Sequence, residues 1–281
     1  MNGGLKLRER KKALVMLNIS KLAKTFHLDN NPLNDKLALV DINLTIREGD
    51  FISVIGGNGS GKTTLLNIIA GVHMPDRGII SLNNIALTNL KEYQRARYIG
   101  RVFQDPLSGT VGDMSIEENL ALASKRGQSL SLKWGLSALK RHGYKELLQD
   151  LDLGLETRLK AKVLHLSGGQ RQALTLLMAT MVRPDILLLD EHVAALDPKT
   201  ARNVMAITEK IVTEKKITTL MITHNMKDAI RYGNRLLMMS NGRIIFDCGG
   251  EEKKSLTVEQ LISKFNDSSE DELPDSLVLS N

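Results

Sequence analysis

The chain has 281 residues, of which 42% are apolar, and lysine and arginine exceed the acids by six. A chain of this length and composition can bury a good core, so we expect a globular protein. Its single cysteine excludes an internal disulfide and a multi-cysteine metal site, and favours a reducing compartment. No apolar run reaches the ~18 residues that a membrane helix needs, so any membrane role must come through partner chains.

Charge is distributed unevenly along the chain. Basic residues crowd the start and acidic residues load the tail, and we expect residues 1–15 to be a disordered extension and the tail to be solvated. The small positive excess would suit a membrane surface or a nucleic acid, but an ordinary solvated surface explains it more simply. The basic start resembles a secretory signal, yet polar residues soon interrupt the stretch that follows it, so we expect the protein to stay in the cytoplasm.

Strand patterns dominate the first hundred residues. Apolar and polar residues alternate over 38–46, and a buried-looking strand follows at 51–55. After it come a glycine-rich loop and a helical pattern over 64–70, which together make a strand, loop and helix unit. Further strands are predicted at 16–19, 78–82 and 98–103.

The middle of the chain changes to helical spacing, and alternation returns after it. Helices are predicted at 114–125, 133–151 and 170–182, as an inserted helical subdomain. Buried strands at 186–189 and 218–222 then flank a helix at 198–213, and this alternation implies a parallel sheet. Near the end, Asn241-Gly242 predicts a hairpin because these residues tolerate positive φ angles.

The glycine-rich loop matches a nucleotide-binding motif. The pattern G-x-x-x-x-G-K-[ST] is fulfilled by Gly56, Gly57, Asn58, Gly59, Ser60, Gly61, Lys62 and Thr63. Its position between a strand and a helix favours phosphate binding over a plain glycine-rich turn. Backbone N–H groups and Lys62 would hold the phosphates, and the Thr63 hydroxyl would ligate Mg²⁺. We therefore expect ATP and Mg²⁺ as ligands, and we include Thr64 in the nucleotide-binding set.

Two adjacent carboxylates, Asp190 and Glu191, follow the strand at 186–189. On its own such a run is more often an ordinary strand end, but together with the phosphate loop it indicates ATP hydrolysis. We expect Asp190 to hold Mg²⁺, directly or through water. Glu191 is expected to act as the general base on the attacking water.

A third motif, Leu166-Ser167-Gly168-Gly169-Gln170, lies shortly before the carboxylates. It opens a helix and makes a second anion-binding helix N-terminus, although a simple capped helix is the alternative. With the other two motifs it resembles the signature sequence of ATP-binding-cassette (ABC) ATPases. The resemblance implies that this signature grips the γ-phosphate of ATP bound to the other subunit, so that two ATP molecules lie between two copies.

The resemblance implies roles for four further residues. Gln104 matches the glutamine that senses Mg²⁺ and the attacking water, and His224 matches the histidine that contacts the γ-phosphate. Asp197 matches the loop that crosses the dimer interface, and Phe26 resembles the aromatic residue that stacks on adenine. The alternative for Gln104 is a surface glutamine, for His224 a structural histidine, and for Phe26 an aromatic residue packed in the core. The expected catalytic set is Lys62, Gln104, Glu191 and His224, and the expected metal ligands are Thr63, Gln104 and Asp190.

The sequence departs from the family pattern at two nearby positions. His192 stands where proline is frequent after the catalytic glutamate, and Ala194 stands where serine is common in the interface loop. Neither change removes an expected ligand of phosphate, metal or water.

The resemblance covers nearly all of residues 16–250 and implies an α/β fold. This fold has a P-loop NTPase core with a parallel sheet, an N-terminal antiparallel β-subdomain and an inserted α-helical subdomain at about 107–183. A C-terminal helix and an acidic tail are expected at 251–281.

The implied function is that of the ATP-hydrolysing subunit of a transporter. A single cassette resembles bacterial importers, with a homodimer of this subunit, separate permease subunits and a substrate-binding protein, at the cytoplasmic face of the membrane. The residues within its motifs resemble those of the importer branch associated with tryptophan- or tyrosine-type binding proteins. The resemblance implies an aromatic amino acid or a similar small solute as the transported substrate. The region around Glu117 and Glu118 resembles the surface that docks on the permease.

Two other functions stay open on sequence grounds. One is the ATPase of an exporter or a lipoprotein-release system, which shares every catalytic motif. The other is a cassette ATPase that acts on DNA or ribosomes. Such proteins usually carry long coiled-coil insertions or tandem cassettes, which this sequence lacks, so no nucleic acid is expected as a partner.

Overall fold

The computed structural model describes residues 15–27, 35–128 and 138–268. The predicted disorder of residues 1–15 falls outside this range except for Val15, and so does most of the predicted acidic tail.

An antiparallel sheet forms the N-terminal part of the fold. Its strands are β1 (Val15–Phe26), β2 (Lys36–Arg47), β4 (Arg77–Leu82) and β5 (Ile85–Ala86), in the order β2-β1-β4-β5. Ile42, Leu44 and Ile46 of β2 are buried while their neighbours face solvent, as the alternating pattern predicts.

The second sheet has the order β10-β9-β3-β8-β7-β6. Its strands are β3 (Phe51–Gly56), β6 (Ile99–Val102), β7 (Ile186–Asp190), β8 (Thr218–Ile222), β9 (Arg235–Ser240) and β10 (Arg243–Gly249). All neighbours are parallel except β9 and β10, which form the predicted hairpin, with φ angles of 46° at Asn241 and 72° at Gly242. The two sheets confirm the predicted α/β fold with an antiparallel β-subdomain.

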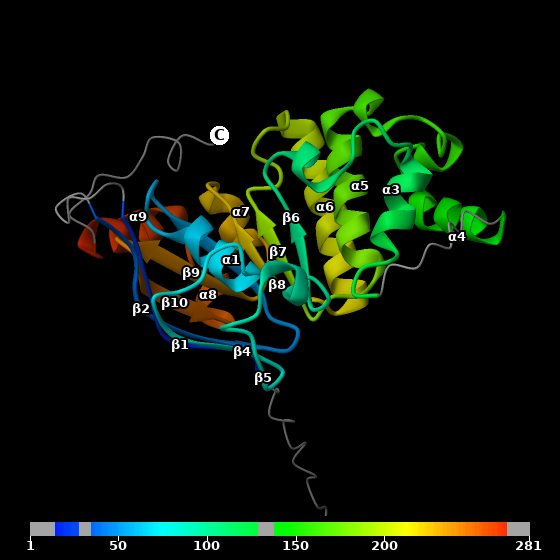
Figure 1. The fold of residues 1–281 in the computed structure, drawn as a ribbon. Coiled ribbons are helices and arrows are strands. Elements are labelled where there is room, and N and C mark those ends of the chain that lie inside the picture. The colour runs from blue at the N-terminus through cyan, green and yellow to red at the C-terminus, as the bar shows by residue number, and fades with distance from the viewer. Residues whose placement is uncertain (1–14, 28–34, 129–137, 269–281) are drawn as a thin grey trace, which may run out of the picture.

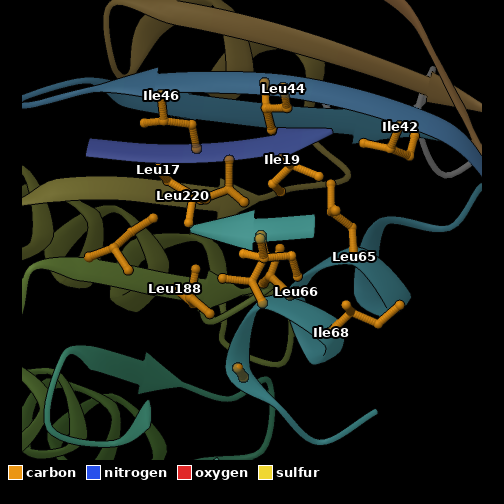
Figure 2. Close-up of a cluster of buried hydrophobic side chains, with 14 of the residues drawn as sticks. Leu17, Ile19, Ile42, Leu44, Ile46, Leu65, Leu66, Ile68, Leu188 and Leu220 are labelled. Atoms are coloured by element: carbon orange, nitrogen blue, oxygen red, sulfur yellow. The ribbon is translucent and has the colours of Figure 1, made fainter. Parts of the chain in front are cut away.

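Helix α1 (Lys62–Ala70) joins the two sheets into one core. Figure 2 shows that Leu65, Leu66 and Ile68 of this helix lie among side chains of both sheets, including Ile42 of β2 and Leu188 of β7. Because α1 is packed against both sheets, the loop at its N-terminus is held by a well-packed part of the core.

Helices α3 (Ile116–Ala123), α4 (Ala138–Gln149) and α5 (Gly168–Met181) gather at the end of the molecule away from the antiparallel sheet (Figure 1). Three short 3₁₀ helices accompany them, at Pro106–Gly109, Leu155–Thr157 and Val163–His165. The boundaries 107–183 of the helical subdomain stay a prediction.

Two helices, α3 and α5, start elsewhere than predicted because serine side chains cap them. Ser115 Oγ accepts the Glu118 N–H at 3.3 Å, so α3 begins at Ile116 and not at Met114. Ser167 caps α5 in the same way, so that helix begins two residues before the predicted start at Gln170.

The remaining helices follow the parallel strands or end the described chain. They are α2 (Glu92–Arg95), α6 (Pro198–Lys215), α7 (Met226–Arg231), α8 (Glu251–Lys254) and α9 (Val258–Ser268). None of the helices in the described ranges is long and apolar enough to cross a membrane.

Candidate functional site

The phosphate loop runs from the carboxyl end of β3 to the start of α1, and its glycines are sterically required. A Cβ atom on Gly56 would lie 2.2 Å from the carbonyl oxygen of Met239, and one on Gly61 would lie 2.5 Å from that of Ala38. Gly61 also has a φ angle of 99°, which side-chain-bearing residues rarely adopt. The loop can therefore pack against β2 and β9 only with glycine at these positions.

Lys62 is the first residue of α1, and its amine is held inside the loop. Its Nζ atom donates hydrogen bonds of 2.8 Å to the carbonyl oxygens of both Gly56 and Gly57. Burial lowers the pKa of Lys62, and the negative charges of Glu191 and Asp190 oppose this shift. The loop, the cation and the two carboxylates thus form one electrostatic unit.

Asp190 ends strand β7 and meets the start of α1. The Thr63 hydroxyl lies 3.5 Å from Asp190 Oδ1, and the Arg101 guanidinium lies 3.5 Å from Asp190 Oδ2. Burial raises the pKa of Asp190, and the charge of Arg101 opposes the rise. A hydroxyl and a carboxylate that face each other are oxygen ligands of the type Mg²⁺ prefers. No cluster of three or more His, Cys, Asp and Glu side chains suited to a metal occurs in the described ranges.

Glu191 and His224 follow neighbouring parallel strands, β7 and β8, whose carboxyl ends lie side by side. Oε1 of Glu191 is in direct contact with Nε2 of His224, and both side chains are mostly shielded from solvent. The Glu191 N–H donates to the carbonyl oxygen of Ile222 at 3.2 Å. Glu191 has a φ angle of 47°, a left-handed conformation that is uncommon for a residue with a side chain.

The signature motif forms a capping box at the start of α5. Ser167 Oγ accepts the Gln170 N–H at 3.2 Å, and Gln170 Oε1 accepts the Ser167 N–H at the same distance. A Cβ on Gly169 would lie 2.2 Å from Thr200 Cγ2, so glycine allows the starts of α5 and α6 to touch. Ser167 and Gly168 remain exposed. Within the described ranges, no hydrogen bond or ion pair joins residues 167–170 to the phosphate loop.

Comparison with known proteins identifies this arrangement. The family model described as "ABC transporter" matches residues 39–194, which include the phosphate loop, the signature and both carboxylates. The chain belongs to the ABC transporter family. It is therefore an ATP-binding and ATP-hydrolysing cassette.

Individual relatives agree with this assignment. The cassette is 47% identical, over 89% of its length and 98% of the relative's, to a tyrosine transport ATP-binding protein of Clostridioides difficile. It is 34% identical to a thiamine import ATP-binding protein of Haemophilus influenzae, over 78% of its own length and 96% of the relative's. A solved dimeric ATP-binding cassette, bound to ADP and phosphate in a post-hydrolysis state, matches with a TM-score of 0.69 and 30% identity. This match covers 83% of the cassette and 98% of the solved chain.

Asp197 lies at the start of α6 and caps that helix. Its Oδ1 atom accepts the N–H groups of Lys199 and Thr200, each at 3.1 Å. Hydrogen bonds from Thr200 are the main reason why the pKa of Asp197 is lowered. The structure thus gives Asp197 a capping role in the single chain, beside the signature helix. Its expected role at a dimer interface stays a prediction.

Phe26 lies at the end of β1, close to the phosphate loop. It is the register partner of Lys36, whose amine lies 3.7 Å from where a Cβ on Gly59 would be. The Phe26 ring is half-buried and makes an edge contact with His73, with ring centroids 5.2 Å apart. The structure therefore brings the end of β1 near the phosphate loop, and the expected stacking of Phe26 on adenine stays a prediction.

Gln104 follows β6 and is exposed. The backbone carbonyl of the preceding residue, Phe103, accepts a 3.1 Å hydrogen bond from Gln172 of α5. The loop that carries Gln104 is therefore tied to the helical end of the cassette.

Arg101 and His192 make contacts beside the site that the motifs do not predict. Arg101 contacts Asp190 and also donates to Asn67 of α1 at 2.6 Å. His192 is buried, and its ring contacts Thr208 of α6 at 3.1 Å. Arg101 is the last but one residue of β6, and Asp190 is the last residue of the neighbouring parallel strand β7. The contacts of Arg101 and His192 depend on strand register and helix packing, for which one sequence carries no signal.

Proposed function

We propose that this ABC ATPase powers the import of a small solute, and that the solute is an aromatic amino acid of the tyrosine type. The observation that carries the proposal is the 47% identity to a tyrosine transport ATP-binding protein, which extends over 98% of that protein. A match of this length includes the helical end as well as the catalytic core, and the permease-specific contacts of a cassette are expected outside the shared motifs.

We assign the phosphates of ATP to the loop 56–64. Backbone N–H groups and the N-terminus of α1 attract the negative charge, and the buried amine of Lys62 can turn from the loop carbonyls to the terminal phosphates. Phe26 stacks on the adenine. The steric need for glycine at positions 56 and 61 supports this assignment, because it lets the loop pack closely against the backbones of β9 and β2 in this conformation.

Thr63, Asp190 and Gln104 are the proposed Mg²⁺ ligands. The facing oxygens of Thr63 and Asp190 fit a hard cation, and Gln104 follows the neighbouring strand. When bound, Mg²⁺ neutralises charge on the phosphate oxygens. The Arg101 guanidinium lies by the other oxygen of the Asp190 carboxylate and offsets its charge.

Glu191 takes the proton of the attacking water, and His224 contacts the γ-phosphate. Their direct contact supports this division of roles, because the imidazole of His224 can orient the Glu191 carboxylate by hydrogen bonding to it. The flanking strands β7 and β8 hold both residues at the carboxyl edge of the sheet, beside Asp190.

Ser167, Gly168, Gly169 and Gln170 complete the site of a second copy of the chain. Within one chain this motif is exposed at its start and is not bonded to the phosphate loop, and a solved relative is dimeric. ATP closure of the dimer, with Asp197 at the interface, would then drive the permease between two states.

The remaining partners are separate permease subunits and a substrate-binding protein, with the cassette at the cytoplasmic face of the membrane. The carboxylates expected near the permease are already engaged: Glu117 is buried and paired with Arg141 at 2.7 Å, and Glu118 accepts hydrogen bonds from Ser115.

The test is a reconstituted transporter in proteoliposomes, with the permease that co-purifies with the cassette and its binding protein. We expect tyrosine-loaded binding protein to stimulate ATP hydrolysis and tyrosine uptake, and Lys62→Ala to abolish both. Stimulation by thiamine or sulfate in place of aromatic amino acids would overturn the substrate class. Movement of solute out of the cytoplasmic side would overturn the direction and favour an exporter.

A further inference from the structure

The residue after the proposed base is buried against helix α6. His192 is 2% exposed and Thr208 is fully buried, and the imidazole Nε2 lies 3.1 Å from the Thr208 hydroxyl. Thr208 lies in the interior of α6, the helix that Asp197 caps. This contact therefore links the loop that carries Glu191 directly to α6, the helix that begins at the proposed dimer interface.

The direction of the hydrogen bond follows from the threonine. The Thr208 hydroxyl has one hydrogen, and it donates this hydrogen to the carbonyl oxygen of Val204 at 2.8 Å. Towards His192 the hydroxyl can then only accept, so the imidazole carries its proton on Nε2. The pair thus has a defined donor and acceptor, and replacing either side chain by an apolar one removes the bond.

Two features of Glu191 indicate that its loop needs an anchor to a neighbouring element. Its left-handed backbone, with φ of 47°, persists in folded proteins only where the surroundings hold it. A cavity of about 240 Å³ is lined by Glu191, His192 and His224, so there is space into which a loosened loop could move. Backbone hydrogen bonds already hold Glu191, from its own N–H to the carbonyl oxygen of Ile222 and from the Ala194 N–H to its carbonyl oxygen. The contact of His192 with Thr208 adds a side-chain anchor at the next residue.

We propose that His192 is a positioning residue, which holds the Glu191 carboxylate against His224 by anchoring the following residue to Thr208 of α6. The inference rests on the proposed role of Glu191 as base. We expect His192 to affect the chemical step and not nucleotide binding, because neither His192 nor Thr208 touches the phosphate loop in the described contacts.

The experiment measures kcat and KM for ATP together with Tm, on the full chain. His192→Leu and Thr208→Val each remove the bond and are expected to lower kcat about tenfold or more, with KM within about twofold. His192→Gln keeps an N–H donor and Thr208→Ser keeps the hydroxyl, and both should recover much of the lost kcat. Thr180→Val is the matched control. Thr180 is equally buried, but its hydroxyl bonds only to carbonyls of its own helix, so kcat of this variant should match the wild type.

The double variant separates positioning from simple stability. Thr208→Val alone leaves a buried N–H without an acceptor and lowers Tm, whereas His192→Leu combined with Thr208→Val removes both polar partners, so Tm should return toward wild type. For a positioning residue kcat stays low in the double variant. A kcat that recovers with Tm, or an unchanged kcat in Thr208→Val, would overturn the inference.

Glu191→Gln measured alongside distinguishes the two proposals. If turnover is lost in Glu191→Gln and retained in His192→Leu, the role of His192 is wrong and the proposed base stands. If Glu191→Gln hydrolyses ATP at the wild-type rate, the proposed base is wrong and the inference falls with it.

Discussion

The hydroxyl of Thr63 lies 3.5 Å from a carboxylate oxygen of Asp190, although 127 positions separate the two residues in the chain. They meet because β3 and β7 both pair with β8, so that the carboxyl ends of these parallel strands face the same edge of the sheet. This is the geometric basis for placing Mg²⁺ there.

Asp190→Asn should therefore remove most Mg²⁺-dependent ATP hydrolysis. We expect a loss of about 100-fold or more in kcat, because the amide cannot supply the charge that balances the cation at the phosphates. The measurement is ATP turnover over a range of Mg²⁺ concentrations. Asp113→Asn, which changes an exposed carboxylate of the helical end, is the control, and equal activity of the two variants would exclude Asp190 as a ligand.

Lys62→Ala should weaken ATP binding. Hydrogen bonds to charged groups contribute about 1.5–3 kcal/mol, so ATP affinity is expected to fall about 10- to 100-fold. Equilibrium binding of a fluorescent ATP analogue checks this, with thermal unfolding as the control for a native fold. Unchanged affinity would mean that the amine stays on the loop carbonyls of Gly56 and Gly57 when nucleotide binds.

Arg95 should stabilise the phosphate-loop helix from its far end. This fully buried guanidinium donates to the carbonyl oxygens of Ile68 and Ile69, at 2.6 and 2.9 Å, in the last turn of α1. Arg95→Met would leave several buried carbonyls unpaired and should lower the free energy of unfolding by about 2–4 kcal/mol. Urea denaturation measures the change. The exposed Arg97→Met should cost less than about 0.5 kcal/mol, and a similar effect of both variants would contradict the capping role.

Cys248 should be unreactive in the folded protein. Burial is the main cause that raises the pKa of this thiol to about 11, so at pH 8 it is protonated in the native state, and only the thiolate reacts. We expect slow alkylation by iodoacetamide at pH 8 and fast alkylation once urea unfolds the chain. Equal rates in the two states would show that the thiol is accessible and ionises normally.

The sequence predicts those parts of the fold and site that depend on short-range patterns. The strand before the phosphate loop, the buried strand before Asp190 and the Asn241-Gly242 hairpin are all found, since strong periodicity or turn chemistry specifies each one. Helix α5 begins two residues before the predicted start at Gln170, because Ser167 caps it and the helix includes Gly168 and Gly169.

Relationships between distant elements could not be predicted in this way. The contacts of Arg101 with Asp190 and of His192 with Thr208 depend on strand register and on the packing of α6. A local sequence pattern predicts neither the register nor this packing. The left-handed backbone of Glu191 is also invisible to propensity, because tertiary contacts impose it. The roles of the site residues themselves stay predictions.

The central claim is that ATP is hydrolysed between two copies of the chain, with Glu191 as base. The most direct test is light scattering of Glu191→Gln after size-exclusion chromatography, with and without ATP and Mg²⁺, together with its ATP turnover. We predict a stable dimer only with ATP, and turnover lowered by about 100- to 10,000-fold, because water is no longer deprotonated. A variant that stays monomeric with ATP, or that still hydrolyses ATP rapidly, would contradict the claim.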